Sequence, residues 1–486
     1  MYNDKLEQAN EYIIINKIPK DELPVFHVAP YCGWMNDPNG FSVYNGKAHL
    51  FYQHNPYSEE WGSIHWGHCE TEDFVKWNDL PVALAPDQEY DGAGCFSGSA
   101  IETKEGHILM YTGVVKEILD GVEKEYQNQC LAVGNGRSYT KSKHNPVVTG
   151  DMMPENFSRE HFRDPKIWQE DDGYYMIAGN KTIDGVPQVV LFRSEDLRDW
   201  HYVSVLAKDR CGRLGTMWEC PDFFYMDGQY VLIASPQDMR ADEEFHNGNN
   251  AVYFMGEYDK NKYEFDYREV HSLDDGLDFY APQTTLAPDG RRIMIAWMQS
   301  WDSNIRPAGQ KWSCMMTLPR ELKIVNGKLL QSPVREIERY YVKPVRYDNI
   351  VIAGKCILPE VKGRMLDLTV EISGGDYNEF SIHFAGNEMF STNLTYYKEK
   401  NMLEIDRTYS GMVRDAIGIR RVKVKGQKEK LKLRIILDKY SAEVFVNDGV
   451  QVLSTTFYTP AKAEDISFEC DGTAIATIQK HTISVG

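Results

Sequence analysis

Hydrophobic and polar positions alternate in short runs along the first two thirds of the chain, and clusters of Gly, Asp, Asn and Pro separate these runs. Short runs bounded by turn-forming residues predict β-strands rather than helices. We expect such strands at 48–52, 107–111, 174–178, 230–234 and 292–297. Long helical periodicity is absent between residues 26 and 322. The pattern therefore predicts an all-β region.

Two kinds of repetition divide this region. The segment 71–77 (TEDFVKW) recurs as the segment 194–200 (SEDLRDW), 123 residues further on. Polar residues near Pro or Gly also recur at steps of 55 to 67 residues, at Asp37, Ser97, Asp164, Glu219 and Tyr280. Repeats of about 60 residues with short strands are typical of β-propeller blades. Five starts predict five blades whose first strands line a central channel; unrelated turns of one large sandwich are the alternative.

A different pattern begins after residue 344. Longer alternating runs at 366–372, 379–384, 393–397, 431–437 and 442–446 are typical of half-buried antiparallel strands. We interpret them as a C-terminal β-sandwich. The predicted division is an N-terminal extension (1–25), a five-bladed β-propeller (26–325), a linker (326–344) and a β-sandwich (345–486).

The acidic composition excludes several classes of partner. The chain has 53 Lys and Arg against 72 Asp and Glu, a formal net charge of −19. A charge of this sign repels nucleic acid and anionic lipid surfaces. No apolar stretch is long enough to span a membrane. We therefore expect neither nucleic acid nor membrane as a partner.

The cysteines and the N-terminus both bear on the compartment. The nine cysteines are odd in number and scattered without CxxC pairs, as expected for reduced thiols. The first twenty residues carry acidic side chains and only a short apolar run, unlike a signal peptide. We therefore expect a cytoplasmic protein, unless a leader was removed before residue 1.

Three carboxylates stand out as candidate chemistry. Asp37 lies among turn formers, and Arg163 beside Asp164 would hold that second carboxyl ionised. Glu219 lies between an indole and a thiol, an apolar setting that favours the protonated form. Glycoside hydrolysis needs one ionised and one protonated carboxyl at the same bond. The three residues therefore suit that reaction class.

Six motifs carry a resemblance to a known family. They are WMNDPNG (34–40), FSGS (96–99), FRDP (162–165), ECP (219–221), DFYAPQ (278–283) and EVFVNDG (443–449). With these six motifs in this order, the chain resembles the glycoside hydrolase family 32 β-fructosidases, above all the bacterial sucrose and sucrose-6-phosphate hydrolases. The family's fold is a five-bladed propeller followed by a β-sandwich, which agrees with the periodicity.

The resemblance also implies roles for individual residues. Asp37 corresponds to the nucleophile that forms a fructosyl-enzyme, Glu219 to the general acid/base, and Asp164 to the residue that stabilises the transition state. Further positions match the fructose pocket: Asn36, Gln53, Trp61, Phe96, Ser97, Arg163, Tyr280 and Trp297. The resemblance implies a small sugar as partner and no cofactor.

A metal site is the one competing chemistry that the sequence suggests. His65, His68 and Cys69 are close in sequence, as metal ligands can be. A strand would place His65 and His68 on opposite faces, and no CxxC pair completes a site. We therefore expect no metal.

The exact substrate stays open at this stage. Sucrose, sucrose-6-phosphate and short fructans all fit, a fructosyltransferase shares the same intermediate, and a non-catalytic carbohydrate-binding protein is the alternative from another class. Arg306 and Lys311 are candidates for a phosphate contact by position alone. The sequence does not decide between a monomer and a homodimer.

Overall fold

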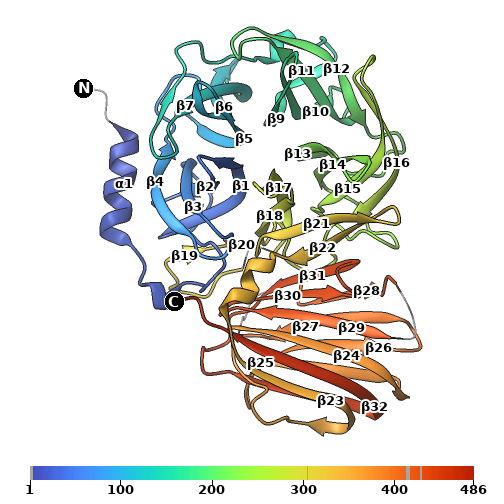
Figure 1. Cartoon of the computed structure of the whole chain (residues 1–486). Helices are drawn as coiled ribbons and strands as arrows, with labels where there is room; N and C mark the ends of the chain where they lie inside the picture. Colours follow the sequence, from blue (N-terminus) through green and yellow to red (C-terminus); the bar gives the residue numbers. More distant parts are fainter. Residues whose placement is uncertain (1–3, 304, 412–415, 427–429) are drawn as a thin grey trace.

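The computed structural model describes residues 4–303, 305–411, 416–426 and 430–486, which form a ring of five small sheets and one larger sheet beside it (Figure 1). The five sheets are the blades of a β-propeller. In each blade the strands follow one another antiparallel, from an innermost strand outward. The predicted five-bladed propeller is therefore confirmed.

The blades contain the following strands. Blade 1 has β1 (Gly33–Tyr44), β2 (Lys47–Asn55), β3 (His65–Thr71) and β4 (Asn78–Leu84), and blade 2 has β5 (Gly94–Thr103), β6 (Gly106–Leu119), β7 (Val122–Gly134) and β8 (Tyr139–Lys141). Blade 3 has β9 (Phe157–Glu170), β10 (Gly173–Thr182), β11 (Pro187–Ser194) and β12 (Trp200–Lys208), and blade 4 has β13 (Met217–Met226), β14 (Gln229–Gln237), β15 (Val252–Asp259) and β16 (Glu264–Ser272). Blade 5 has β17 (Tyr280–Leu286), β18 (Arg292–Met298), β20 (Met315–Met316), β21 (Arg320–Val325) and β22 (Lys328–Pro333). A short strand, β19 (Trp312–Ser313), pairs in parallel with the start of β1 and so ties the blade 5 connection to blade 1.

The strands expected at 48–52, 107–111, 174–178, 230–234 and 292–297 are the second strands of the five blades. Their central residues are buried, because neighbouring sheets pack against both faces of each strand. The echoed segments 71–77 and 194–200 occupy the same place in blades 1 and 3, the turn from third to fourth strand. In both turns an aspartate, Asp73 or Asp196, accepts hydrogen bonds from backbone N–H groups two or three residues ahead. The sequence echo thus arises from a shared Asp turn.

The C-terminal sheet contains β23 (Tyr341–Cys356), β24 (Leu366–Asp376), β25 (Glu379–Gly386), β26 (Ser391–Tyr397), β27 (Met402–Tyr409), β28 (Ile419–Lys423), β29 (Leu431–Leu437), β30 (Ser441–Val446), β31 (Gln451–Thr456) and β32 (Asp465–Ile483). β32 joins its two halves, because its first part pairs with β25 and its second with β24. Apolar residues from both halves form one core. This confirms the sandwich-like architecture.

Several short elements lie outside these sheets. Helix α1 (Lys5–Asn16) packs beside β4, where the Val82 N–H donates to Asn10. The 3₁₀ turns are η1 (Lys20–Glu22), η2 (Gly150–Met152) and η3 (Arg335–Tyr340). The stretch 326–344, expected as a linker, holds β22, η3 and the first residues of β23, so that only η3 separates propeller from sandwich. No helix of the described residues is long and apolar enough to cross a membrane.

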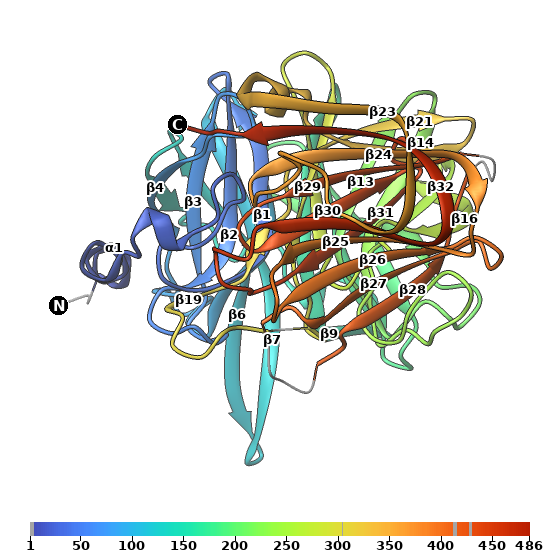
Figure 2. The ribbon, with the colours of Figure 1, turned by 90° about the horizontal axis from the view of Figure 1, so that it is seen from below.

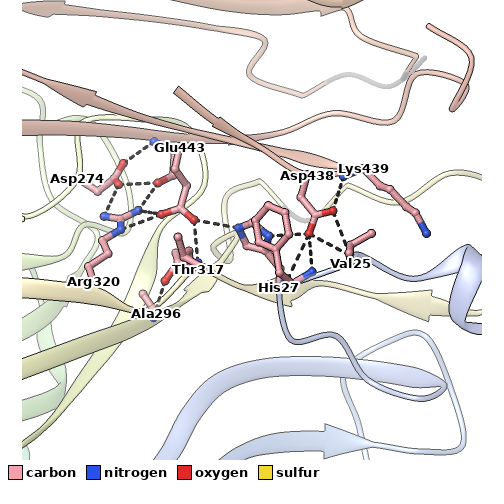
Figure 3. Close-up of polar contacts among 12 residues, drawn as sticks. Val25, His27, Asp274, Ala296, Thr317, Arg320, Asp438, Lys439 and Glu443 are labelled. Atoms are coloured by element: carbon pink, nitrogen blue, oxygen red, sulfur yellow. Dashed lines mark hydrogen bonds and ion pairs between the residues drawn. The ribbon is translucent and has the colours of Figure 1, made fainter. Parts of the chain in front are cut away.

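A buried ionic network joins the propeller to the sandwich (Figure 3). We call it the interface cluster, and its members are His27, Asp274, Arg320, Asp438 and Glu443. The His27 ring lies between two carboxylates, with Nδ1 2.9 Å from Asp438 and Nε2 2.9 Å from Glu443. Arg320 reaches Asp274 at 3.0 Å and Glu443 at 2.6 Å. Apolar side chains of β29, β30 and β31 pack with blade 1 around it.

Candidate active site

The innermost strands of the five blades carry the five recurring residues of the sequence. Asp37 lies on β1, Ser97 on β5, Asp164 on β9, Glu219 on β13 and Tyr280 on β17. These strands neighbour one another around the central channel, as Figure 1 shows. The structure therefore explains the spacing of about 60 residues as one innermost strand per blade.

Each of these strands bulges at the recurring residue. The pairing register shifts between Met35 and Pro38, between Phe96 and Gly98, and correspondingly in the other three innermost strands. In four of them a proline follows within two residues, where it needs no ladder hydrogen bond. Bulges bend a strand and re-aim its side chains. Here they direct polar side chains of neighbouring blades toward one point.

Asp37 is buried and surrounded by hydrogen-bond donors. Its Oδ2 accepts from Ser97 Oγ at 2.6 Å and from Gln53 Nε2 at 3.4 Å, and its Oδ1 accepts from Asn36 Nδ2 at 3.2 Å. Asn36 is oriented in turn by Trp34 Nε1, at 2.7 Å. Burial and then the charge of Glu219 raise the pKa of Asp37 to about 6. The carboxylate is thus held in one orientation and ionised at neutral pH.

Asp164 is also buried, and its backbone is unusual, with φ of 63°. Its Oδ2 accepts from the Cys220 N–H at 2.9 Å. The Cys220 thiol lies between the two aspartates, 3.6 Å from Asp37 Oδ2 and 3.7 Å from Asp164 Oδ2. Burial, and then the Glu219 charge, raise the pKa of Asp164 to about 7. Cys220 therefore bridges the two carboxylates as a neutral donor.

Glu219 is held by four donors. Arg163 reaches Oε1 through Nε at 3.0 Å and through Nη2 at 2.9 Å, while Tyr280 Oη and Gln237 Nε2 donate to Oε2 at 2.6 and 2.8 Å. We call Asp37, Asp164, Glu219 and Arg163 the pocket cluster.

Two expectations about this cluster were wrong. Arg163 forms its ion pair with Glu219, and although its charge lowers the pKa of Asp164 as expected, burial and the Glu219 charge outweigh it and raise that pKa to about 7. Glu219 has a polar setting rather than the expected apolar one, because neighbouring side chains of a strand point to opposite faces. Its neighbour Trp218 packs into the core of blades 3 and 4.

A cavity of about 410 Å³ opens above the pocket cluster. It is lined by Asp37, Gln53, Trp61, Phe96, Glu125, Gln127, Glu160, His161, Arg163, Asp164, Glu219 and Trp301. Trp61 is 47% exposed and meets Phe96 edge to face, with ring centroids 5.8 Å apart. These two rings form an apolar wall opposite the carboxylates.

The remaining predicted binding residues lie behind the cavity wall. Asn36, Ser97 and Tyr280 do not line the cavity but donate to its carboxylates, directly in each case. Trp297 is fully buried and packs edge to face against Trp301, with centroids 5.0 Å apart. The structure thus places Trp297 under the cavity and Trp301 at its surface.

Sequence reasoning missed five residues of the cavity wall. Trp301 follows Trp297 by four residues, and this proximity of two tryptophans was the available indication. Glu125 and Gln127 come from β7, whose hairpin with β6 projects beyond the propeller in Figure 2. Glu160 and His161 lie on β9 just before Arg163. Nothing in the sequence pattern marks these last four as neighbours of the carboxylates.

The histidines considered as metal ligands have other partners. His65 Nδ1 lies 2.7 Å from the Ser63 carbonyl, and His68 Nε2 lies 3.0 Å from His49 Nδ1. No group of three or more His, Cys, Asp or Glu side chains is placed to hold a metal ion in the part of the chain that the structure describes.

Comparisons with protein families and with curated proteins match most of the chain. Residues 27–333 match the profile of the glycosyl hydrolases family 32 N-terminal domain, and residues 336–484 match that of the family 32 C-terminal region. Two Escherichia coli proteins are similar: a raffinose invertase (38% identity, 93% of each chain) and a sucrose-6-phosphate hydrolase (37% identity, 91% of each chain).

Solved structures are similar over nearly the whole chain. A Bombyx mori family 32 β-fructofuranosidase superposes with a TM-score of 0.85 at 30% identity, covering 99% of both chains. A sucrose-6-phosphate hydrolase from Lactobacillus gasseri gives a TM-score of 0.86 at 28% identity, covering 99% of this chain and 97% of that one. From its sequence, fold and site, the chain belongs to glycoside hydrolase family 32.

Proposed function

We propose that the protein is a retaining β-fructofuranosidase, which hydrolyses the terminal β-fructofuranoside bond of sucrose or a closely related sugar. The observation that carries the proposal is the convergence of Asp37, Asp164 and Glu219 from three blades on one cavity. The similar proteins named above as sucrose-6-phosphate hydrolase and raffinose invertase support the substrate class.

In the proposed mechanism, ionised Asp37 attacks the anomeric carbon C2 of fructose and forms a fructosyl-enzyme. Glu219 donates a proton to the departing sugar oxygen and then accepts one from the water that hydrolyses the intermediate. Asp164 accepts hydrogen bonds from fructose hydroxyls and stabilises positive charge at the reacting centre. Arg163 and Tyr280 position Glu219 throughout, since both donate to its carboxylate.

The cavity walls suit the two parts of such a substrate. Trp61 and Phe96 offer apolar faces to the sugar ring, and Gln53 offers a directed hydrogen bond beside Asp37. Trp301, which is 38% exposed, adds a second aromatic surface at the rim. We propose that fructose lies against the pocket cluster and that the leaving sugar lies at the mouth.

The first experiment measures glucose and fructose release from sucrose, together with the anomer of fructose that forms first, by NMR. We expect both products in equal amounts and β-fructofuranose as the first anomer. Binding of sucrose without release would instead favour a non-catalytic sugar-binding protein, and initial α-fructofuranose would contradict a nucleophilic Asp37. Fructo-oligosaccharides that accumulate at high sucrose would identify a fructosyltransferase.

A second experiment tests the assignment of the acid. Glu219→Ala should lose most of its fructosylation rate on sucrose, roughly 10²–10⁴-fold, but much less on a fructoside with an acidic phenol leaving group. Asp164→Ala should lose rate on both substrates, because its role does not depend on the leaving group. Pre-steady-state release of phenol and glucose separates the two variants. Equal losses for Glu219→Ala would assign the acid to another residue.

The compartment and the assembly are also proposals. All nine cysteines are free thiols, as in proteins of a reducing compartment, and we propose a cytoplasmic location. We propose a monomer or a homodimer, which sedimentation at several concentrations decides.

A further inference from the structure

Negative charge dominates the walls of the cavity. Five of its lining residues are carboxylates, namely Asp37, Glu125, Glu160, Asp164 and Glu219. Among the described residues that line it, Arg163 alone carries a permanent positive charge, and it is already paired with Glu219. Burial, and then the charge of Arg163, lower the pKa of His161 to about 4, so this ring is neutral at pH 7.

The five carboxylates lie at two depths. Asp37 and Asp164 are buried at the bottom, whereas Glu160 is exposed and Glu125 half-buried. Glu125 accepts a hydrogen bond from Gln127 Nε2 at 2.8 Å, a neutral partner that leaves its charge in place. Arg159, beside Glu160 in sequence, pairs with Asp151 at 3.0 Å. Glu125 and Glu160 therefore place two charges at the mouth of the cavity.

Three cations considered near the cavity all lie outside its lining. Arg306 lies 3.3 Å from Glu60, and Lys311 lies 4.0 Å from Glu59. Neither residue lines the cavity, although their positions in the sequence had made both candidates for a phosphate contact. Lys181 lies close enough to Glu160 and Arg163 to interact with their charges, and burial lowers its pKa. It too lies outside the lining residues.

We propose that Glu125 and Glu160 make this enzyme selective for uncharged fructosides and reject a leaving sugar that carries a phosphate. The inference rests on the proposed function, because it requires fructose at the pocket cluster and the leaving sugar at the mouth. A phosphate dianion there meets two carboxylates of like charge, whereas neutral hydroxyl groups can donate hydrogen bonds to them. The acidic mouth is thus a specificity element and takes no part in bond cleavage.

Three substrates separate charge from bulk at one position. Sucrose has a free O6 on its glucose, raffinose carries a neutral galactosyl group on that oxygen, and sucrose-6-phosphate carries a phosphate there. We expect kcat/KM for sucrose-6-phosphate to lie at least about 10-fold below that for sucrose, and raffinose to lie between the two. A rate on sucrose-6-phosphate equal to or above that on sucrose overturns the inference.

Charge variants test the two glutamates directly. The double variant Glu125→Gln/Glu160→Gln should raise the ratio of kcat/KM for sucrose-6-phosphate to that for sucrose by about 5-fold or more. Glu195→Gln, which removes one exposed charge at the outer edge of blade 3, is the matched control and should leave the ratio unchanged. An unchanged ratio in the double variant contradicts the proposal.

Salt provides a second readout on the wild-type enzyme. Raising the ionic strength from 0.01 to 1 M shortens the screening length from about 30 to about 3 Å. Because salt then weakens the repulsion of the phosphate, the ratio of kcat/KM for sucrose-6-phosphate to that for sucrose should rise several-fold. If Lys181 recruits the phosphate instead, salt lowers the ratio and Lys181→Gln lowers it further, which overturns the inference. Failure of the proposed function looks different, because then none of the three substrates releases fructose.

Discussion

The chain contains two clusters of buried carboxylates that differ in the cations facing them. The pocket cluster has three carboxylates and one guanidinium, that of Arg163. The interface cluster also has three carboxylates, but both Arg320 and the His27 ring lie among them (Figure 3). Buried carboxylates therefore occur in one cluster with a larger excess of negative charge and in the other with more of that charge offset by cations.

Their pKa values follow this difference. In the pocket cluster, burial and the charge of Glu219 raise the pKa of both Asp37 and Asp164. In the interface cluster, burial would raise the pKa of Asp438 and Glu443 as well, but their cationic partners hold both below the usual values. The exception is Asp274, which shares Arg320 with Glu443 and whose pKa burial raises to about 6. The comparison teaches that burial raises the pKa of a carboxylate unless its cationic partners outweigh burial, as they do for Asp438 and Glu443.

The largest expected effect is on catalysis in the pocket cluster. Asp37→Asn keeps the shape of the side chain but removes the charge that attacks C2, so kcat on sucrose should fall by roughly 10⁴-fold or more. Pre-steady-state fructosylation measures it. Circular dichroism should remain that of the wild type. A variant that keeps a tenth of the activity would mean that Asp37 is not the nucleophile.

The same change of carboxylate to amide should act on stability in the interface cluster. Glu443→Gln leaves Arg320 and His27 buried without their shared anion, so the free energy of unfolding should fall by about 3–5 kcal/mol. Denaturant unfolding measures it. Activity per folded molecule, assayed well below the melting temperature, should be retained. A large loss of kcat at unchanged stability would show that the two clusters are coupled.

The interface cluster should also make stability depend on alkaline pH. Burial alone would lower the pKa of His27, but hydrogen bonds to Asp438 and Glu443 raise it from 6.5 to about 9. The folded state therefore keeps a proton that the unfolded state loses. The resulting stability, roughly 3 kcal/mol, is complete below pH 6.5 and disappears as pH rises through about 9.

The measurement is the difference in unfolding free energy between wild type and His27→Gln, from pH 7 to 10. We expect this difference to shrink as pH rises. Buried histidines whose pKa is lowered, such as His107, titrate below this window and do not disturb it. A constant difference would show that His27 is neutral in the folded protein.

The sequence predicted the architecture better than the electrostatics. The second strand of each blade and the five recurring positions could be predicted, because apolar runs and dipeptides such as Asp-Pro and Cys-Pro are local features of the sequence. The bulges could not be, since a bulge depends on the number of residues in the opposite strand. The ion pair between Arg163 and Glu219 was not visible either, because these residues lie on different blades, 56 positions apart in the sequence. His27 and Glu443 are more than 400 residues apart, so only the docking of propeller and sandwich brings them together.

A smaller effect concerns the contribution of Asp164, a pocket-cluster carboxylate, to the stability of the folded protein. Because the raised pKa of Asp164 means that its ionisation opposes folding, Asp164→Asn should stabilise the protein at pH 8 by about 1–2 kcal/mol while it abolishes most activity. At pH 5, below its pKa of about 7, the gain should be smaller. Thermal unfolding at the two pH values tests this. A loss of stability at pH 8 would mean that Asp164 is a structural carboxylate like Glu443.

The smallest effect concerns Cys220, whose thiol lies between Asp37 and Asp164. Its hydrogen bond helps to lower the pKa of Asp37, while burial raises the pKa of the thiol itself well above its usual value, so it stays a neutral donor. Cys220→Ala should therefore move the acid limb of kcat/KM, expected near pH 6, upward by less than about one pH unit. Cys220→Ser supplies a stronger donor of nearly the same shape and should move the limb the other way. Shifts of the same sign in both variants would mean that packing at this position, and not the hydrogen bond, sets the ionisation of Asp37.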